Sequence, residues 1–509
     1  MTTSSEPASK RSRSADPIVE AARQHFAVSY LYPIQRFVIS NILEEKNQIV
    51  VLPTGAGKSL CYQLPARICS GSTIVVVPLL SLLEDQIGRC RSAGLKAEAL
   101  RGGQRRETRR RLTDELCSGQ IDLLFTTPET LQTISAAGLF AGTEIAHLVV
   151  DEAHCVCEWG ESFRPAYLKL DRAIGKLKPR CLTAFTATAS PRILESIQNV
   201  LFNEQGATIL STDPDRPNIR YSVIPTLSKI RSLLHLVDAS PRPLLVFTRT
   251  RSSAELAART IRRRFPNLPT YFYHAGLNRE ERIRIEAWYK PSGDGILTAT
   301  SAYGLGVDKP DIRTVIHLDV PYSPEAYLQE TGRAGRDGSP VEATLLYSSE
   351  DLGFADTLSA ASGTLPVDSH GATRPAPLAA QRYVQMLGYA LDTEHCRREQ
   401  LLRFLGREAE SCSGCDVCDG RVLTRAEGEA QILEVVSRHR RRFTLLQIVQ
   451  LLRGAKSYEV VRSGLASYQG FGSLTGWQEE EIEEALESLR RSGAIKVLKR
   501  GYWKDRITS

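Results

Sequence analysis

The sequence contains neither a membrane-spanning segment nor a secretory signal. A transmembrane helix needs about 20 consecutive apolar residues, whereas the longest apolar stretch, Thr73 to Leu83, is shorter and contains Pro78. The first residues, Met1 to Ser14, are polar and rich in serine, which is not typical of a signal peptide. We therefore expect a protein of a reducing compartment that has no membrane partner.

The chain also has little net charge, since 65 Lys and Arg residues face 58 Asp and Glu residues and leave a net charge of +7. Basic residues exceed acidic ones in the C-terminal segment 421–509. This local excess indicates a polyanion partner, although a solvated surface is the alternative interpretation. With 509 residues, 42% of them hydrophobic, the chain is long enough for about three or four domains with apolar cores.

Short apolar strands alternate with helical stretches in two successive sets, which predicts an α/β fold with mostly parallel sheets. The first predicted strands are Ile49–Leu52, Thr73–Val77, Ile121–Thr126, Ile145–Val150 and Cys181–Phe185. The second are Leu244–Phe247, Thr270–Tyr273, Gly295–Ala299, Thr314–Leu318 and Ala343–Tyr347. The expected order is a disordered tail (1–16), two α/β domains (17–211 and 212–348), a linker (349–379), a cysteine-bearing helical module (380–422) and a terminal domain (423–509).

The segment PTGAGKS at 53–59 follows an apolar run and precedes a helix that we expect to begin near Lys58. Its glycines allow backbone N–H groups to approach phosphate oxygens without interference from a Cβ. In such loops the Lys reaches the β- and γ-phosphates and the Ser hydroxyl binds Mg²⁺. The alternative is a simple turn, and Leu52 departs from the general pattern, which has Gly there. The predicted ligands of ATP and Mg²⁺ are Thr54, Gly55, Gly57, Lys58 and Ser59.

The tetrapeptide DEAH at 151–154 completes the predicted nucleotide site. The apolar run 145–150 predicts a buried strand, and Asp151 stands at its carboxyl end, where open α/β sheets bind ligands. Asp151 is placed to hold Mg²⁺ through water, and Glu152 to orient and deprotonate the attacking water. An acidic strand-end loop without chemistry is the alternative, but the phosphate loop upstream favours ATP hydrolysis.

The 11 cysteines form two groups. Those expected to be reduced core residues are Cys61, Cys69, Cys90, Cys117, Cys155, Cys157 and Cys181. The others, Cys396, Cys412, Cys415 and Cys418, form two overlapping C-x-x-C pairs plus one distant thiolate, which predicts a tetrahedral Zn²⁺ site. An iron–sulfur cluster is the chemical competitor, a disulfide is disfavoured in a reducing compartment, and His395 is a rival ligand.

The C-terminal segment has the pattern of a winged helix, in which helices are followed by a basic hairpin. Residues 479–492 place Ile482, Ala485, Leu486 and Leu489 on one helical face, and the basic, β-prone segment 494–503 follows. A generic small helical domain is the alternative. Because this helix begins with three glutamates that repel phosphate, we expect DNA to contact Arg441, Arg442, Lys496, Lys499 and Arg500, with Arg438 and Arg440 nearby.

Over residues 20–503 the motif set resembles the RecQ family of superfamily-two DNA helicases. The matching segments are Phe26 to Gln35, PTGAGKSLCYQLPA at 53–66, PLLSLLEDQ at 78–86, TTPE at 126–129, DEAHCVCEWGESFRP at 151–165, TATA at 186–189, His274 to Leu277, TSAYGLGVDKPDIR at 300–313 and QETGRAGRDG at 329–338. The cysteine group and the winged-helix pattern match the family's C-terminal module and separate this chain from other DEAH proteins.

The resemblance implies two RecA-like domains with ATP in their cleft and a 3′→5′ translocase that unwinds duplexes in repair, recombination and replication. It assigns Gln35 to the adenine base and Arg336 to an arginine finger, with Arg333 beside it. It assigns the coupling of single-stranded DNA to hydrolysis to Trp159, Phe163 and Arg164. Single-stranded and forked duplex DNA are the implied partners, together with single-strand-binding or recombination proteins.

Some positions depart from the family pattern. Tyr32 and Ala27 stand where Arg and Gly are usual, which affects ATP affinity rather than catalysis. Glu158 replaces a usual Gln, and Glu161 and Ser162 replace His and Asp, so added acidity is expected to weaken coupling to DNA. Many relatives carry a further helical domain, HRDC, after the winged helix; because this sequence ends at Ser509, we expect it to lack that domain.

Two other functions compete with a DNA helicase. An RNA helicase also fits DEAH, but the four-cysteine module argues against it. A non-catalytic DNA-binding scaffold would have lost Lys58, Asp151, Glu152 or Arg336, and all four are present. The expected location is the cytoplasm, on the nucleoid in a bacterium, or the nucleus in a eukaryote.

Overall fold

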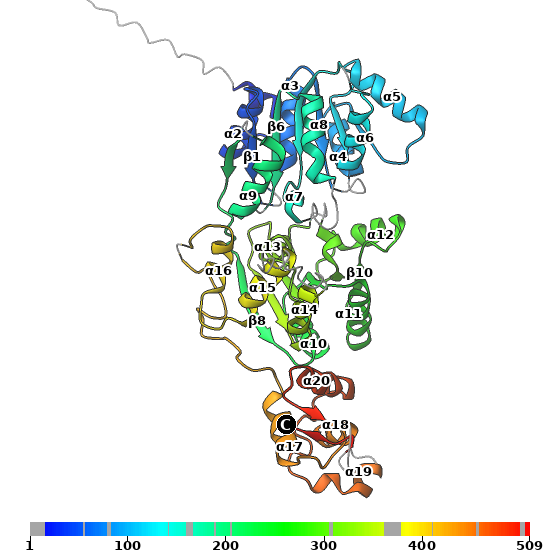
Figure 1. The fold of residues 1–509 in the computed structure, drawn as a ribbon, viewed down its shortest axis with the longest axis vertical. Helices are drawn as coiled ribbons and strands as arrows, with labels where there is room; N and C mark the ends of the chain where they lie inside the picture. Colours follow the sequence, from blue (N-terminus) through cyan, green and yellow to red (C-terminus); the bar gives the residue numbers. More distant parts are fainter. Residues whose placement is uncertain are drawn as a thin grey trace, which may run out of the picture. The chain divides into compact units, whose positions relative to one another are not determined.

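The computed structural model describes residues 16–53, 56–78, 83–140, 142–158, 166–187, 190–203, 206–304, 309–360, 378–409, 411–454, 458–498 and 504–509. The expected disordered tail lies almost wholly outside these residues. The chain divides into two compact units, Met1–Asp213 and Pro214–Ser509 (Figure 1). The helices of the described residues include none that is long and apolar enough to cross a membrane.

The first unit is built on a 7-stranded parallel sheet with the order β3-β4-β2-β5-β6-β1-β7. Its strands are β1 Gln48–Val51, β2 Ser72–Val76, β3 Ala97–Leu100, β4 Leu123–Thr126, β5 Ile145–Val150, β6 Cys181–Thr186 and β7 Thr208–Ser211. Helices α1 Pro17–Phe26, α2 Pro33–Leu43, α3 Lys58–Ile68, α4 Leu83–Ser92, α5 Arg106–Cys117, α6 Pro128–Ala136, α7 Cys155–Glu158, α8 Leu170–Leu177 and α9 Pro191–Ile197 accompany it.

The apolar runs of the sequence became the central strands of this sheet. Strands β1, β2, β4, β5 and β6 are buried along their whole length, which is why continuous apolar runs identified them. The sequence did not predict β3 and β7. Strand β3 contains no β-branched residue, and β7 is an exposed edge strand with only two consecutive apolar residues, so neither forms the apolar run of a buried strand.

The second unit begins with a 6-stranded parallel sheet with the order β10-β11-β9-β12-β13-β8. Its strands are β8 Ile219–Pro225, β9 Leu244–Phe247, β10 Thr270–Tyr273, β11 Ile296–Ala299, β12 Thr314–His317 and β13 Val341–Tyr347. Helices α10 Lys229–Ala239, α11 Arg251–Arg264, α12 Arg279–Tyr289, α13 Pro324–Thr331 and α14 Ser349–Ala360 accompany it. Strand β8 was not predicted because its buried residues alternate with half-buried ones such as Arg220 and do not form an apolar run.

The prediction of a linker over 349–379 is wrong for its first part, because α14 occupies Ser349–Ala360. Its remainder lies mostly outside the described residues. Helices α15 Leu378–Leu391 and α16 Arg397–Phe404 follow, and then the loop that carries three of the four grouped cysteines. This loop joins the edge of the second sheet, where Asp416 N donates to Tyr221 O (3.0 Å).

The C-terminal segment contains helices and a short hairpin, as the winged-helix pattern predicts. Its elements are α17 Glu429–Arg438, α18 Leu445–Arg453, α19 Tyr458–Ser463, α20 Glu479–Arg491, β14 Lys496–Val497 and β15 Ile507–Thr508. The expected apolar face of α20 is buried at Ile482, Ala485, Leu486 and Leu489. Strand β14 pairs in antiparallel fashion with β15, so the hairpin closes beyond the segment 494–503.

Candidate functional site

The phosphate loop leads from β1 directly into α3, which begins at Lys58 as predicted. Gly57 caps this helix with a φ of 75°, and a Cβ added to it would lie 2.5 Å from Gln35 Nε2, so only glycine fits. Gln35 Nε2 donates to Ala56 O (2.9 Å), and Gln35 Oε1 accepts from Tyr32 N (3.0 Å). Gln35, predicted to contact adenine, therefore also ties the start of α2 to the phosphate loop. Thr54 and Gly55 lie outside the described residues.

The DEAH loop continues the sheet beyond the end of β5. Asp151 N donates to Val76 O (2.8 Å), and Ala153 N donates to Phe185 O (2.8 Å). Between them Glu152 has a φ of 48°, a left-handed conformation that non-glycine residues seldom adopt and that often marks functional sites. The structure thus places both acidic residues at the carboxyl edge of the sheet, where the sequence predicted them.

The two halves of the predicted nucleotide site meet at this edge. Lys58 Nζ lies 3.4 Å from Glu152 Oε1, although 94 residues separate them in the sequence. Both side chains are largely shielded, with exposed fractions of 10% and 16%. His154, for which the sequence predicted no role of its own within DEAH, has its Nδ1 3.4 Å from Glu152 Oε2 and 3.1 Å from Thr186 Oγ1, so it links DEAH to the TATA segment.

The electrostatics of Asp151 suit a carboxylate that binds a cation. Burial raises its pKa to about 6, the neighbouring Lys58 opposes this shift, and Glu152 adds to it. A divalent cation would offset the effect of burial on this pKa, because it supplies positive charge next to the carboxylate. Asp151, together with Ser59 in the first turn of α3, fits Mg²⁺ with its usual oxygen ligands.

The predicted arginine residues lie in the second unit, in the loop 332–339 between α13 and β13, which we call the finger loop. Arg333 is buried and Arg336 is half-buried. Backbone hydrogen bonds attach the finger loop to the segment before β12: Gly335 N donates to Ile312 O (3.0 Å), and Arg336 N donates to Pro310 O (2.9 Å).

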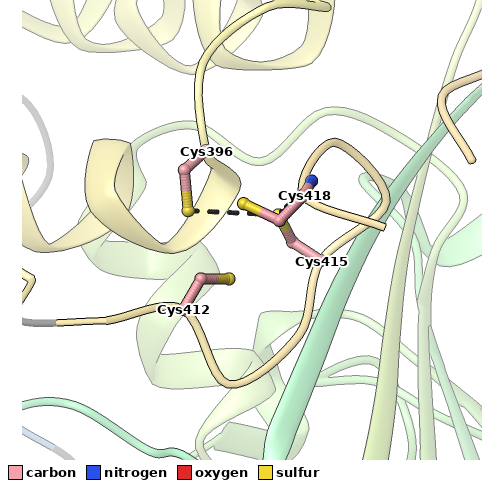
Figure 2. Close-up of side chains that lie close together, drawn as sticks. All are labelled: Cys396, Cys412, Cys415 and Cys418. Carbon is pink, nitrogen blue, oxygen red and sulfur yellow. Dashed lines mark hydrogen bonds between the residues drawn. The ribbon is translucent and has the colours of Figure 1, made fainter. Parts of the chain in front are cut away.

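The four grouped cysteines converge on one point (Figure 2). Cys396 precedes α16, and the other three come from the loop 412–418, so that all four Sγ atoms lie within 4.8 Å of one another. A tetrahedral zinc site with Zn–S bonds of about 2.3 Å places its sulfurs about 3.8 Å apart, and the Sγ atoms of Cys396 and Cys415 are 4.0 Å apart. The described residues therefore contain a four-thiolate site of the size that Zn²⁺ requires.

The surroundings of Cys415 favour the thiolate that a metal needs. Cys418 N donates to Cys415 Sγ (3.4 Å). Although burial acts to raise it, the backbone N–H groups of Cys418 and Arg397 hold the pKa of Cys415 below its ordinary value. His395 is not a member of the cluster, because its Nδ1 pairs with Asp392 Oδ2 (2.8 Å) and its side chain is 66% exposed.

The remaining cysteines follow the prediction of reduced core residues only in part. Cys61, Cys90, Cys155 and Cys181 are buried, and among the described residues they form no disulfide. The prediction is wrong for Cys117, which is exposed at the end of α5, and Cys69 is only half-buried. The side chain of Cys157 lies outside the described residues.

Two of the predicted DNA-binding residues of the C-terminal segment, Arg441 and Lys496, lie at its hairpin. Arg441 N donates to Ile507 O (2.8 Å), and Ile507 pairs with Val497, the neighbour of Lys496. Arg441 and Lys496 are both exposed. The Arg442 guanidinium instead lies 4.5 Å from the centre of the Tyr468 ring. Lys499 and Arg500 lie outside the described residues, as do Trp159, Phe163 and Arg164.

The acidic face of α20 is engaged within the second unit. Glu484 Oε2 accepts from Ser228 Oγ (2.6 Å), and Glu484 Oε1 accepts from Lys229 N (3.0 Å) at the start of α10. Arg231 donates to Glu481 Oε2 (3.2 Å) and lies 4.5 Å from the centre of the Trp477 ring. These carboxylates thus bind the sheet domain of their own unit.

Models of known protein families match the chain in the order of these sites. The DEAD/DEAH box helicase model matches residues 32–197, and the helicase conserved C-terminal domain matches residues 228–338. The RecQ zinc-binding model matches residues 368–419, and the RQC domain matches residues 427–503. The fold and the nucleotide site therefore define a helicase with two RecA-like domains, followed by a zinc-binding module and a winged-helix region.

Sequence identity to individual relatives identifies the family of this chain. The chain is 31% identical to the ATP-dependent DNA helicase RecQ of Haemophilus influenzae, over 91% of this chain and 73% of the relative. It is also 31% identical to RecQ of Bacillus subtilis, over 89% of this chain and 75% of the relative. It is 33% identical to the ATP-dependent DNA helicase hus2/rqh1 of Schizosaccharomyces pombe, of which it spans only 34%. The chain belongs to the RecQ family of ATP-dependent DNA helicases.

Solved structures agree on the fold. The helicase Lhr of Mycobacterium smegmatis, solved with single-stranded DNA and AMP-PNP, has a TM-score of 0.53 and 19% identity, over 94% of this chain and 74% of Lhr. The DEAD-box helicase Mss116, solved with single-stranded RNA and UDP-BeF, has a TM-score of 0.54 and 18% identity, over 73% of this chain and 80% of Mss116. At these identities the likeness concerns the fold alone.

Proposed function

We propose that this protein translocates on single-stranded DNA in the 3′→5′ direction and unwinds duplexes at the expense of ATP. The observation that carries the proposal is the meeting of Lys58 with Glu152 (3.4 Å) beside the half-buried Asp151. A helix N-terminus, a lysine and two carboxylates at the carboxyl edge of a parallel sheet are the groups that phosphoryl transfer requires. Membership in the RecQ family supports DNA as the substrate.

In this proposal each residue of the nucleotide site has one task. The phosphate loop and Lys58 hold the β- and γ-phosphates, while Asp151 and Ser59 hold Mg²⁺, which supplies positive charge to the phosphate oxygens. Glu152 orients the attacking water and accepts its proton. Before ATP binds, Lys58 pairs with Glu152. When ATP is bound, Lys58 contacts the phosphates instead. Arg336 stabilises the charge that develops on the transferring phosphoryl group, with Arg333 beside it.

DNA is contacted at two places in this proposal. Trp159, Phe163 and Arg164 bind the tracked single strand and couple it to hydrolysis, because bases stack on aromatic rings and arginine holds phosphate. The hairpin with Arg441 and Lys496 contacts the duplex ahead, joined by Arg442, Lys499 and Arg500. Forked DNA in repair, recombination or replication is the substrate class, and single-strand-binding or recombination proteins are the expected partners.

A single measurement distinguishes the competing functions: ATPase activity with single-stranded DNA, with RNA and without nucleic acid. We expect strong stimulation by DNA and little by RNA. Equal stimulation by RNA would support an RNA helicase, and no hydrolysis under any condition would support a scaffold. Unwinding of duplexes with a 3′ or a 5′ single-stranded tail then tests polarity, and we expect unwinding with the 3′ tail only.

A further inference from the structure

The finger loop is held by a side chain from the segment that leads into β8. Arg216 donates through Nη1 to Gly332 O (3.2 Å) and through Nη2 to Ala334 O (3.0 Å) and Gly335 O (2.8 Å). One planar guanidinium therefore binds three carbonyl oxygens, which lie on both sides of Arg333. They are 116 to 119 residues from Arg216 in the sequence. Since arginine presents its donors in a fixed fork, these bonds determine the orientation of the loop as well as its distance.

Asn218 holds the same loop at its other end. Its Nδ2 donates to Gly335 O (2.9 Å) and to Ser339 O (2.9 Å). Gly335 has a φ of 55°, and a Cβ added there would lie 2.5 Å from both Asn218 Nδ2 and Val341 Cγ2. The residue before Arg336 thus has one backbone conformation, enforced by its contacts.

The four-cysteine module reaches Arg216 through Arg398, which lies in the first turn of α16, two residues after Cys396. Arg398 Nη1 donates to Arg216 O (3.1 Å) and pairs with the Asp215 carboxylate, while Nη2 donates to Ile219 O. The Arg398 side chain is 1% exposed. A continuous series of contacts therefore runs from the cysteine cluster through Arg398 and Arg216 to the loop of Arg336.

We propose that Arg216 is a positioning residue for Arg336, and that Arg398 and Asp215 make this position depend on the folded four-cysteine module. The inference rests on the proposed role of Arg336 in ATP hydrolysis and assigns the module a part in the rate of chemistry. Burial lowers the pKa of Arg216, and the positive charge of Arg336 acts in the same direction.

The test compares kcat and KM for ATP in the zinc-loaded full chain with saturating single-stranded DNA. Arg216→Ala removes three bonds from the finger loop, and a misplacement of about 1 Å costs on the order of 100-fold in catalysis. We expect kcat to fall about 10- to 100-fold with KM changed less than about twofold, because ATP binding depends on the phosphate loop. Arg216→Lys and Arg398→Lys keep the charge and should give smaller losses.

Arg220→Ala is the matched control. Arg220 lies on β8 and pairs with Asp419 of the cysteine loop, so it too joins sheet and module, but within the described part of the chain it does not bond to the finger loop. Its kcat should equal that of the wild type. Zinc content should be the same in all variants, and amide hydrogen exchange over residues 332–339 should be faster in the Arg216 and Arg398 variants only.

The possible outcomes distinguish a failure of this inference from a failure of the proposed function on which it rests. Wild-type kcat and exchange in both Arg216 variants, with Arg336→Ala inactive, would overturn the inference alone. An active Arg336→Ala would overturn the role of Arg336 as well. A loss that Arg220→Ala shares, or one that comes with loss of zinc, would mean general destabilisation and would also overturn the inference. If Arg216→Ala does not fold, Arg216→Lys and its exchange rates decide.

Discussion

The DEAH loop of the first unit and the finger loop of the second are held in different ways. The DEAH loop directly extends β5, and its backbone donates to the neighbouring strands at Val76 and Phe185 (both 2.8 Å). The finger loop follows helix α13, and besides its backbone bonds to Ile312 O and Pro310 O, the side chains of Arg216 and Asn218 hold its carbonyls. Backbone bonds of a sheet survive most side-chain changes, whereas the part of a loop's position that side chains determine depends on those residues.

This difference predicts which substitutions should change the chemistry of a site and which should change its geometry. In the first unit, a change at a site residue removes its chemistry and leaves the loop in place. In the second unit, changes at residues that touch no substrate should move the site. Substitutions in both units test this contrast.

Lys58→Ala should abolish ATP hydrolysis and leave the melting temperature nearly unchanged. Lys58 is a phosphate ligand at the start of α3, and its only ion pair among the described residues is with Glu152 at 3.4 Å. Steady-state ATPase and thermal unfolding measure the two effects. The matched control is Lys46→Ala, whose side chain is 56% exposed and pairs with Glu44 near β1, and which should hydrolyse ATP normally. Wild-type turnover by folded Lys58→Ala would reject the nucleotide site.

Glu152→Gln should lower kcat about 10²- to 10⁴-fold, the usual contribution of a general base, while ATP and Mg²⁺ still bind. The amide keeps the shape of the side chain but cannot accept the proton of water. A fluorescent ATP analogue measures binding beside single-turnover hydrolysis. Loss of binding as severe as the loss of hydrolysis would make Glu152 a binding residue instead.

Cys415→Ala should release zinc and impair the second unit only. We expect the four-cysteine site to bind about one zinc per chain through four thiolates, and a structural zinc site contributes directly to folding. We expect a protease-sensitive C-terminal half with nucleotide binding by the first unit retained. Elemental analysis and limited proteolysis measure this. Cys61→Ala, a buried cysteine of the first unit, should keep its zinc. Iron with sulfide in the wild type would reject the zinc assignment.

Arg441→Ala and Lys496→Ala should have the smallest effect, a weaker binding of forked DNA with little change in stability. Each substitution that removes one phosphate ligand should reduce the slope of log affinity against log salt by about 1. Arg490→Ala is the control, because Arg490 lies in the same domain but pairs with Glu487. Fork affinity and salt slope that stay at wild-type values would remove the hairpin from the DNA path.

The sequence predicted those parts of the fold whose signal is local. Central strands such as β5 and β9 were found with their observed bounds, because strands buried on both faces require continuous apolar runs. Strand β8 alternates, β3 lacks β-branched residues and β7 is an exposed edge, so none of them forms such a run. Helix α14 was not predicted because the Ser- and Gly-rich residues that follow it favour a linker over the whole segment.

The sequence alone predicted the nucleotide and zinc ligands, because a phosphate loop, a strand-end DEAH and C-x-x-C pairs are each recognisable within a short stretch of chain. The contacts that hold these groups in position are visible only in the folded structure. Gln35 ties the phosphate loop, His154 joins DEAH to Thr186, and Arg216 and Arg398 brace the finger loop. Their partners lie 21 to 182 residues away, and no local pattern of polarity or periodicity indicates a hydrogen bond to a residue so distant in the sequence.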